Sequence, residues 1–176
     1  MTYLSANVFY EKTKHEVENS PSAQEITTSW ADVSYSTISY LPAAFSKYVI
    51  YDFSVSGSRS SSSRENAYFK LQYSDDNGSS WSDWGDNTQF FLGSKETIPR
   101  LGGVYDIKFC LKVDDSGSRP KWTKERILKL QVKKANGTIT LHKFNEFRLN
   151  GATVSGNHFY SPTVCCYSIA SKDVVI

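Results

Sequence analysis

Short runs of alternating hydrophobic and polar residues recur along this chain. The clearest is "VYDIKFCLKV" at residues 104–113, where every second residue from Tyr105 to Val113 is hydrophobic and most residues between them are polar. The runs "KYVIYDFSV" at 47–55 and "AYFKLQYS" at 67–74 alternate in the same way. A period of two is typical of β-strands that bury one face, so each run predicts such a strand.

Clusters of Ser, Gly, Asn and Asp separate these runs, and no helical period intervenes. The stretch "SGSRSSSSRENA" at 56–67 has almost nothing to bury, which predicts a long exposed loop. Asn136-Gly137 predicts a tight hairpin that returns "TITLHKF" antiparallel to "RILKLQVKK". No internal repeat is apparent. The pattern predicts an all-β protein, with a single antiparallel β-sandwich of jelly-roll type over residues 26–176.

Residues 1–25 form a separate prediction. They alternate only weakly and end in a turn-like stretch around Pro21. We expect an extended N-terminal arm or edge strand that needs a partner, with Tyr3, Phe9 and Tyr10 as its anchoring side chains.

Composition agrees with a β protein and narrows the partners. Hydrophobic residues make up 39% of the chain and aromatic residues 14%, a bias that suits pleated, half-buried surfaces. The net charge is +2 and the basic residues are scattered, so we expect no nucleic-acid partner. No apolar run approaches the roughly 20 residues that cross a bilayer, and the first residues lack a secretory signal pattern. We therefore expect a soluble protein made in a cytoplasm.

The segment from Ser74 to Trp81 spells S-x-D-x-G-x-x-W, with Asp76 and Gly78 at the other fixed positions. It resembles the Asp box, a turn in the blades of sialidases and related β-propellers. The carboxylate accepts backbone amides, the glycine adopts an unusual conformation, and the tryptophan packs under the loop. Only one copy is present, and 176 residues are too few for a six-bladed propeller. The resemblance therefore implies a structural turn and no activity.

No pattern of catalytic or metal-binding residues stands out. His15, His142 and His158 share no metal-ligand spacing, and pairing Cys165 with His158 as a nucleophile matches no known signature. The "DDNG" and "DDSG" turns lack the twelfth-position glutamate of a calcium loop. We expect a non-enzymatic protein without cofactor or metal.

The cysteines predict free thiols. There are three of them, and two are adjacent, Cys165 and Cys166. Neighbouring residues of a strand point to opposite faces, so we expect at least one of the three thiols to be buried.

Tryptophans in or beside predicted loops leave two alternatives open. Trp84 and Trp122, like Trp81, could expose ring faces that stack on a sugar or on a partner. Alternatively, the rings plug the loops against the sandwich.

Four ordered elements carry a family resemblance: Ser29-Trp30, Asp32-Val33, and the segments 38–42 and 49–53. Together they are similar to a stretch in small structural proteins of tailed bacteriophages, including cyanophages, over roughly the middle 60 residues. The resemblance implies a sandwich or jelly-roll module that decorates heads or forms part of tails and fibres, commonly as a trimer. It transfers no catalytic residues.

The expected function is accordingly that of a virion structural protein, one that decorates or cements a capsid surface. Its expected partners are the major capsid or tail protein and further copies of itself, with a homotrimer favoured. The alternatives are a tail or fibre component, or a carbohydrate-binding module that recognises a host surface glycan.

Overall fold

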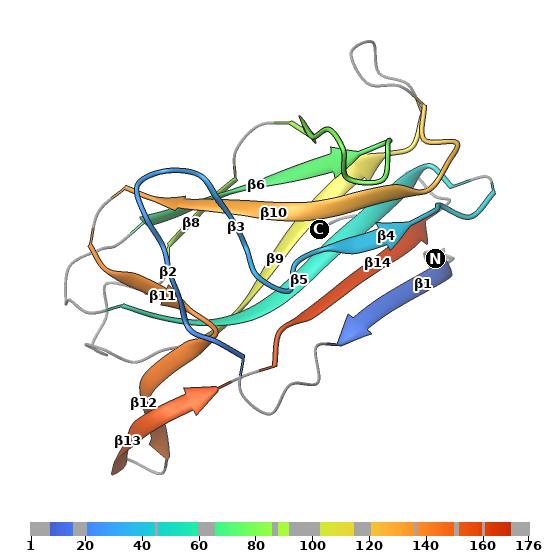
Figure 1. Cartoon of the computed structure of the whole chain (residues 1–176). Coiled ribbons are helices and arrows are strands. Elements are labelled where there is room, and N and C mark those ends of the chain that lie inside the picture. The colour runs from blue at the N-terminus through green and yellow to red at the C-terminus, as the bar shows by residue number, and fades with distance from the viewer. Residues whose placement is uncertain are drawn as a thin grey trace, which may run out of the picture.

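The computed structural model describes residues 8–15, 21–44, 46–59, 66–85, 88–91, 103–114, 121–135, 137–149, 152–159 and 161–169. Within these ranges every regular element is a β-strand, which confirms the all-β prediction (Figure 1). For β1, β8, β12 and β13 only the backbone is described.

Two antiparallel sheets make up the body of the structure. The first sheet has the order β1 (Val8–His15), β14 (Thr163–Ile169), β5 (Tyr48–Arg59), β11 (Ile139–Leu141) and β2 (Gln24–Glu25), with β9 (Gly103–Lys112) also paired to β5. The second has the order β3 (Ala31–Asp32), β10 (Arg126–Lys134), β6 (Asn66–Ser74) and β7 (Ser82–Asp83). In that sheet β4 (Ile38–Tyr40) pairs with β10, and β8 (Thr88–Phe91) pairs with β6. A separate hairpin joins β12 (Lys143–Leu149) to β13 (Ala152–Phe159).

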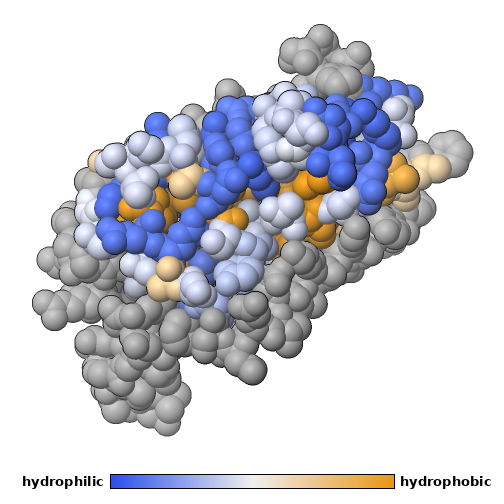
Figure 2. All heavy atoms as spheres, viewed as in Figure 1, coloured by the Kyte–Doolittle hydropathy of each residue, from blue (hydrophilic) through white to orange (hydrophobic). Residues whose placement is uncertain are grey.

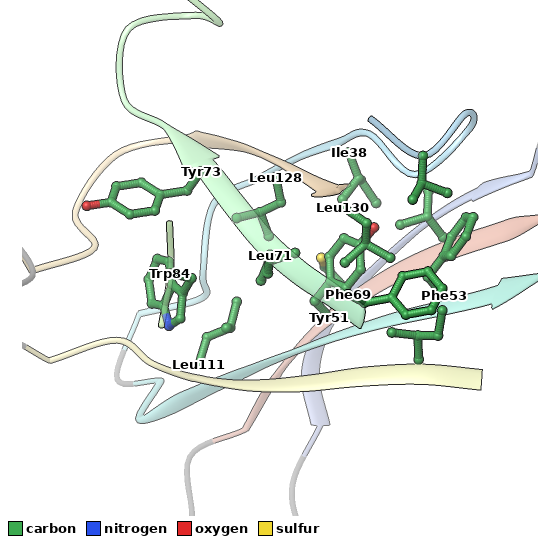
Figure 3. Packing of buried hydrophobic residues seen from close by; sticks show 14 of the residues in the cluster. Ile38, Tyr51, Phe53, Phe69, Leu71, Tyr73, Trp84, Leu111, Leu128 and Leu130 are labelled. Atoms are coloured by element: carbon green, nitrogen blue, oxygen red, sulfur yellow. The ribbon is translucent and has the colours of Figure 1, made fainter. Parts of the chain in front are cut away.

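The core lies between the two sheets, which confirms the β-sandwich. Figure 3 shows the core side chains that meet there, from both sheets: Tyr51, Phe53, Phe69, Leu71, Leu128 and Leu130. All six are buried, as the alternation of the sequence predicted. Figure 2 shows hydrophobic residues in the seam between β10 and the first sheet. The likeness to a jelly roll stays a prediction.

The predicted loop at 56–67 was wrong at both ends. β5 continues to Arg59, and β6 begins at Asn66. Ser56 and Ser58 are buried, because β5 pairs with β9 on one side and with β11 on the other, which satisfies its backbone groups. The low hydrophobicity of this stretch misled the prediction, because its strand character comes from backbone pairing with β9 and β11.

The predicted hairpin between β10 and β11 was also wrong. β11 pairs with β5 and β2 in the first sheet, whereas β10 belongs to the second sheet. The connection that contains Gly137, with φ of 69°, therefore carries the chain from one sheet to the other. A turn signal in the sequence predicts that the chain changes direction, but it does not specify with which strand the following strand pairs.

The fold contains an internal repeat that the sequence analysis missed. Its first half runs from β3 to β6 and its second from β7 to β10. Each half begins with a Trp-x-Asp triplet, residues 30–32 and 81–83, and ends with a Lys-Leu-Gln triplet, residues 70–72 and 129–131. The two Lys-Leu-Gln triplets pair antiparallel, with Leu71 opposite Leu130.

Strand pairing follows the same local two-fold relation. Arg126 pairs with Tyr40 of β4, and the equivalent Ala67 pairs with Phe90 of β8. β5 and β9, the equivalent strands of the first sheet, also pair with each other. Each half therefore contributes matching strands to both layers of the sandwich.

Candidate functional site

The predicted Asp-box turn joins the two halves of the repeat. The Ser74 hydroxyl donates to the Asp76 carboxylate at 2.7 Å and accepts the Gly78 amide at 2.8 Å. Asp76 also accepts the amide of Ser80 at 2.9 Å and its hydroxyl at 2.5 Å. The bonds from Ser80 and Ser74 lower the pKa of Asp76 to about 2. Asn77 and Gly78 have φ of 56° and 89°, the left-handed region. All of these hydrogen bonds lie within the turn, which they stabilise.

Trp81, the last residue of the motif, is half-buried. A Cβ on Gly78 would lie 3.8 Å from its ring, so Trp81 packs beside the turn. Its ring also extends over β10, where the Nζ of Lys129 lies 3.9 Å from the ring centroid. Trp81 therefore belongs both to the turn and to the outer face of the second sheet.

Trp84 and Trp122 are buried, so of the two alternatives for them the one with ring faces exposed for stacking is wrong. They are 5% and 3% exposed, and their ring centroids lie 5.3 Å apart in the core. The alternative, that they plug loops against the sandwich, describes their position. A tryptophan near a loop in sequence packs inward when the core has room for its large apolar ring.

These two rings form an aromatic box around Arg126. Its guanidinium carbon lies 4.9 Å from the ring centroid of Tyr73, 5.5 Å from that of Trp84 and 5.3 Å from that of Trp122. Its Nε donates to the Asp75 carboxylate at 2.6 Å, while the arginine side chain is 1% exposed. The box is thus filled by a cation of the protein itself.

The outer face of the second sheet carries two equivalent clusters. In the first, the Lys129 Nζ and the Gln131 Nε2 both donate to the carboxylate of Asp32, at 2.7 and 2.8 Å. Burial raises the pKa of Asp32, but these hydrogen bonds and the lysine charge outweigh it and lower the pKa. The ring of Trp81 lies against the same lysine.

The second cluster repeats the first. The Lys70 Nζ and the Gln72 Nε2 donate to the carboxylate of Asp83, at 3.0 and 2.7 Å. Here too burial opposes ionisation, and the bonds from Gln72 and Lys70 lower the pKa of Asp83. Trp30 takes the place of Trp81, with the Lys70 Nζ 4.9 Å from its ring centroid and that of Lys133 at 4.8 Å.

We call these eight residues the tryptophan face: Trp30, Asp32, Lys70, Gln72, Trp81, Asp83, Lys129 and Gln131. Sequence reasoning missed it, although the repeated Trp-x-Asp and Lys-Leu-Gln triplets were a usable signal. Figure 2 shows hydrophilic residues gathered over β10, which carries part of this face.

The N-terminal strand forms one edge of the first sheet. β1 pairs antiparallel with β14, and within the described residues β14 is its only strand partner. Phe9 and Tyr10 lie in β1, where only the backbone is described, and Tyr3 lies outside the described residues.

An open cavity of about 560 Å³ lies at the end of the sandwich beside the β4–β5 connection. Leu41, which is 48% exposed, lines it together with Val113 and Trp122. A Lys47–Asp114 pair at 3.2 Å is also part of its wall. Apolar side chains beside charged ones are typical of protein contacts.

The expected thiols are confirmed, because none of the three cysteines is in a disulfide. Cys110 is exposed, Cys165 half-buried and Cys166 buried. His158 lies in β13, whose side chains are not described. The described part of the chain contains no group of three or more His, Cys, Asp or Glu residues placed to hold a metal ion. It also contains no helix long and apolar enough to cross a membrane.

Comparison with known proteins adds no family assignment. No protein-family model matches the chain, and no curated protein is detectably similar to it in sequence.

Proposed function

We propose that the protein is a non-enzymatic structural component of a virus particle, which decorates or cements the capsid surface through contacts with the major capsid protein. The segments that resemble tailed-phage structural proteins lie around β3, β4 and β5, in the first half of the repeat. The structure is a sandwich with one contiguous hydrophobic core, and a close-packed core of this kind suits a structural module.

The observation that carries this proposal is the position of β1 at a sheet edge. An edge strand presents backbone N–H and C=O groups that can pair with a strand of a neighbouring chain. In the proposal, residues 1–25 anchor the domain to its neighbour in this way. The cavity beside Leu41 offers a second apolar contact in a homo-oligomer, for which we favour a trimer.

Immunogold labelling of intact particles, with an antibody against the recombinant protein, tests this proposal. We expect label over the heads. Absence of label, with the protein missing from purified particles, would overturn the virion role.

The anchoring role has its own test. A synthetic peptide of residues 1–25 should compete with the full-length protein for co-sedimentation with particles, because it carries the strand that pairs. A peptide of the same composition in scrambled order is the matched control. Equal competition by the two peptides, or none by either, would show that residues 1–25 are not the anchor.

The second candidate is a tail or fibre component that recognises the host surface. The tryptophan face favours it, since partly exposed aromatic rings among polar side chains are suited to binding a ligand. Label confined to the tail would select this candidate over capsid decoration.

A further inference from the structure

We propose that the tryptophan face is a binding site for a neutral hexose oligosaccharide. Sugar binding goes beyond a structural role. It is tested on the purified protein, whereas the virion proposal is tested on particles, so either proposal can fail without the other.

The two indole rings are placed as stacking platforms. Lys70 and Lys129, whose Nζ atoms lie 4.9 Å from the ring centroid of Trp30 and 3.9 Å from that of Trp81, are only 13% and 12% exposed. An amine on the solvent side of a surface ring would be well exposed, so the lysines lie beneath the indoles. Lys133, whose Nζ lies 4.8 Å from the Trp30 centroid, is on the same outer face of the sheet as Lys70 and so also approaches that ring from the sheet side. Trp30 and Trp81 are half-buried residues, and we infer that the ring face turned away from these lysines is open to solvent. Such faces pack against the C–H surface of a sugar ring, as amphipathic aromatics do at other contacts.

The charge of the face selects a neutral ligand. Each of the two lysines is paired with a carboxylate, Lys129 with Asp32 and Lys70 with Asp83. Lys133, over the Trp30 ring, has no ion-pair partner within the described part of the chain and adds one positive charge at the margin of the face. A polyanion such as a nucleic acid or a sulfated glycan needs several cations that are not already neutralised. The pairing therefore disfavours those ligands.

Hydrogen-bonding groups flank the platforms in fixed positions. Gln131 commits its Nε2 to Asp32, and among the described residues no group donates to its Oε1. Gln72 commits its Nε2 to Asp83 but is itself buried, so it orients the aspartate. Asp32 and Asp83 side chains are 55% and 48% exposed, with their orientation set by two donors each. Carboxylate and amide oxygens held in this way can accept hydrogen bonds from sugar hydroxyls without losing much side-chain entropy on binding.

The repeat makes the two platforms equivalent halves of one site. Trp81 reaches Lys129 of β10, and Trp30 reaches Lys70 of β6, the neighbouring strand. A ligand long enough to contact both rings gains from linkage, since the second contact becomes intramolecular. We therefore expect a hexasaccharide to bind more tightly than the corresponding monosaccharide.

Isothermal titration calorimetry with defined hexasaccharides tests the proposal. The probes are cellohexaose, maltohexaose, laminarihexaose and mannohexaose, with an oligogalacturonate hexamer as the anionic comparison. We expect at least one neutral hexamer to bind, and Trp30→Ala and Trp81→Ala each to weaken that binding by about tenfold. The anionic hexamer should not bind at physiological salt.

The controls separate stacking from folding. Tyr167→Ala changes a half-buried aromatic residue on the first sheet and should leave the affinity unchanged. Trp30→Phe and Trp81→Phe keep a ring and should retain most of the binding, and ligand should shift the tryptophan fluorescence of the wild type. The proposal is overturned if no neutral hexamer binds, if binding survives both alanine substitutions, or if the anionic hexamer binds more tightly.

Discussion

Leu71 lies opposite Leu130 at the centre of the pairing between β6 and β10, and the two residues occupy the same position of a repeated Lys-Leu-Gln triplet. The hydrogen bonds around them repeat as well. The amide of Val33 donates to the carbonyl of Leu130 at 2.8 Å, and that of Trp84 donates to the carbonyl of Leu71 at 2.8 Å. The two halves are therefore equivalent in backbone pairing, although few of their side chains are identical.

Equivalent positions should contribute equally to stability. Both leucines are at most 2% exposed, so Leu71→Ala and Leu130→Ala should each lower the free energy of unfolding by about 2–5 kcal/mol through lost burial and cavity formation. We expect the two values to agree within about 1 kcal/mol in urea denaturation. A large loss at one site with almost none at the other would contradict the equivalence.

Arg126 depends on Asp75 for its charge balance. Asp75→Ala removes the carboxylate that accepts from Nε of a side chain only 1% exposed, and should destabilise the fold by about 3 kcal/mol. Arg126→Met in the same background removes the buried charge and should restore part of the loss. Thermal unfolding of the two single variants and the double variant measures this coupling, and additive effects would exclude it.

His142 makes stability depend on pH. It is fully buried, has φ of 65°, and neither ring nitrogen has a hydrogen-bond partner among the described residues. Burial lowers the pKa of His142 from its ordinary 6.5 to about 4. The unfolded chain therefore takes up a proton first as the pH falls. The contribution of neutral His142 to the free energy of unfolding is fully present above about pH 6.5. It declines as the pH falls to about 4 and is constant below that, and the free energy of unfolding decreases by about 3 kcal/mol in all.

The variant His142→Asn isolates this contribution, since asparagine tolerates a positive φ and does not titrate. Denaturant unfolding between pH 4 and 7.5 should show a steeper pH dependence for the wild type than for the variant. Identical slopes would mean that His142 does not remain neutral in the folded protein.

The turn between the halves should be sensitive to its serine and its glycine. Ser74 is 2% exposed, and its hydroxyl forms hydrogen bonds with both Asp76 and Gly78. Ser74→Ala removes this hydroxyl and should lower the free energy of unfolding by about 1–3 kcal/mol. Gly78→Ala forces a side chain to φ of 89° and should cost about 1 kcal/mol. Ser79→Ala, at an exposed neighbour, is the control and should have little effect on the melting temperature.

The sequence was sufficient for strands whose alternation is regular, such as β6 and β9, and for the polar network of the Asp-box turn. It failed where small polar residues are buried, as at Ser56 and Ser58, because hydrophobicity does not report backbone pairing on both sides of a strand. It left two alternatives open for Trp84 and Trp122, since local context cannot show that Arg126, far along the chain from Trp84, completes their box. The tryptophan face can be predicted only when the strand order is known, because the strand order brings residues 30 and 70 together.

The strand order within the repeat also limits how the chain can be divided. β3 and β4 of the first half pair with β10 of the second, while β7 and β8 of the second half pair with β6 of the first. The first strands of each half thus complete the sheet of the other half. The arrangement resembles a strand-swapped dimer whose two subunits are joined in one polypeptide. A cut at the Asp-box turn would leave two fragments that are each incomplete alone and complementary when mixed, so this protein is suited to conversion into a split pair that reassembles on contact.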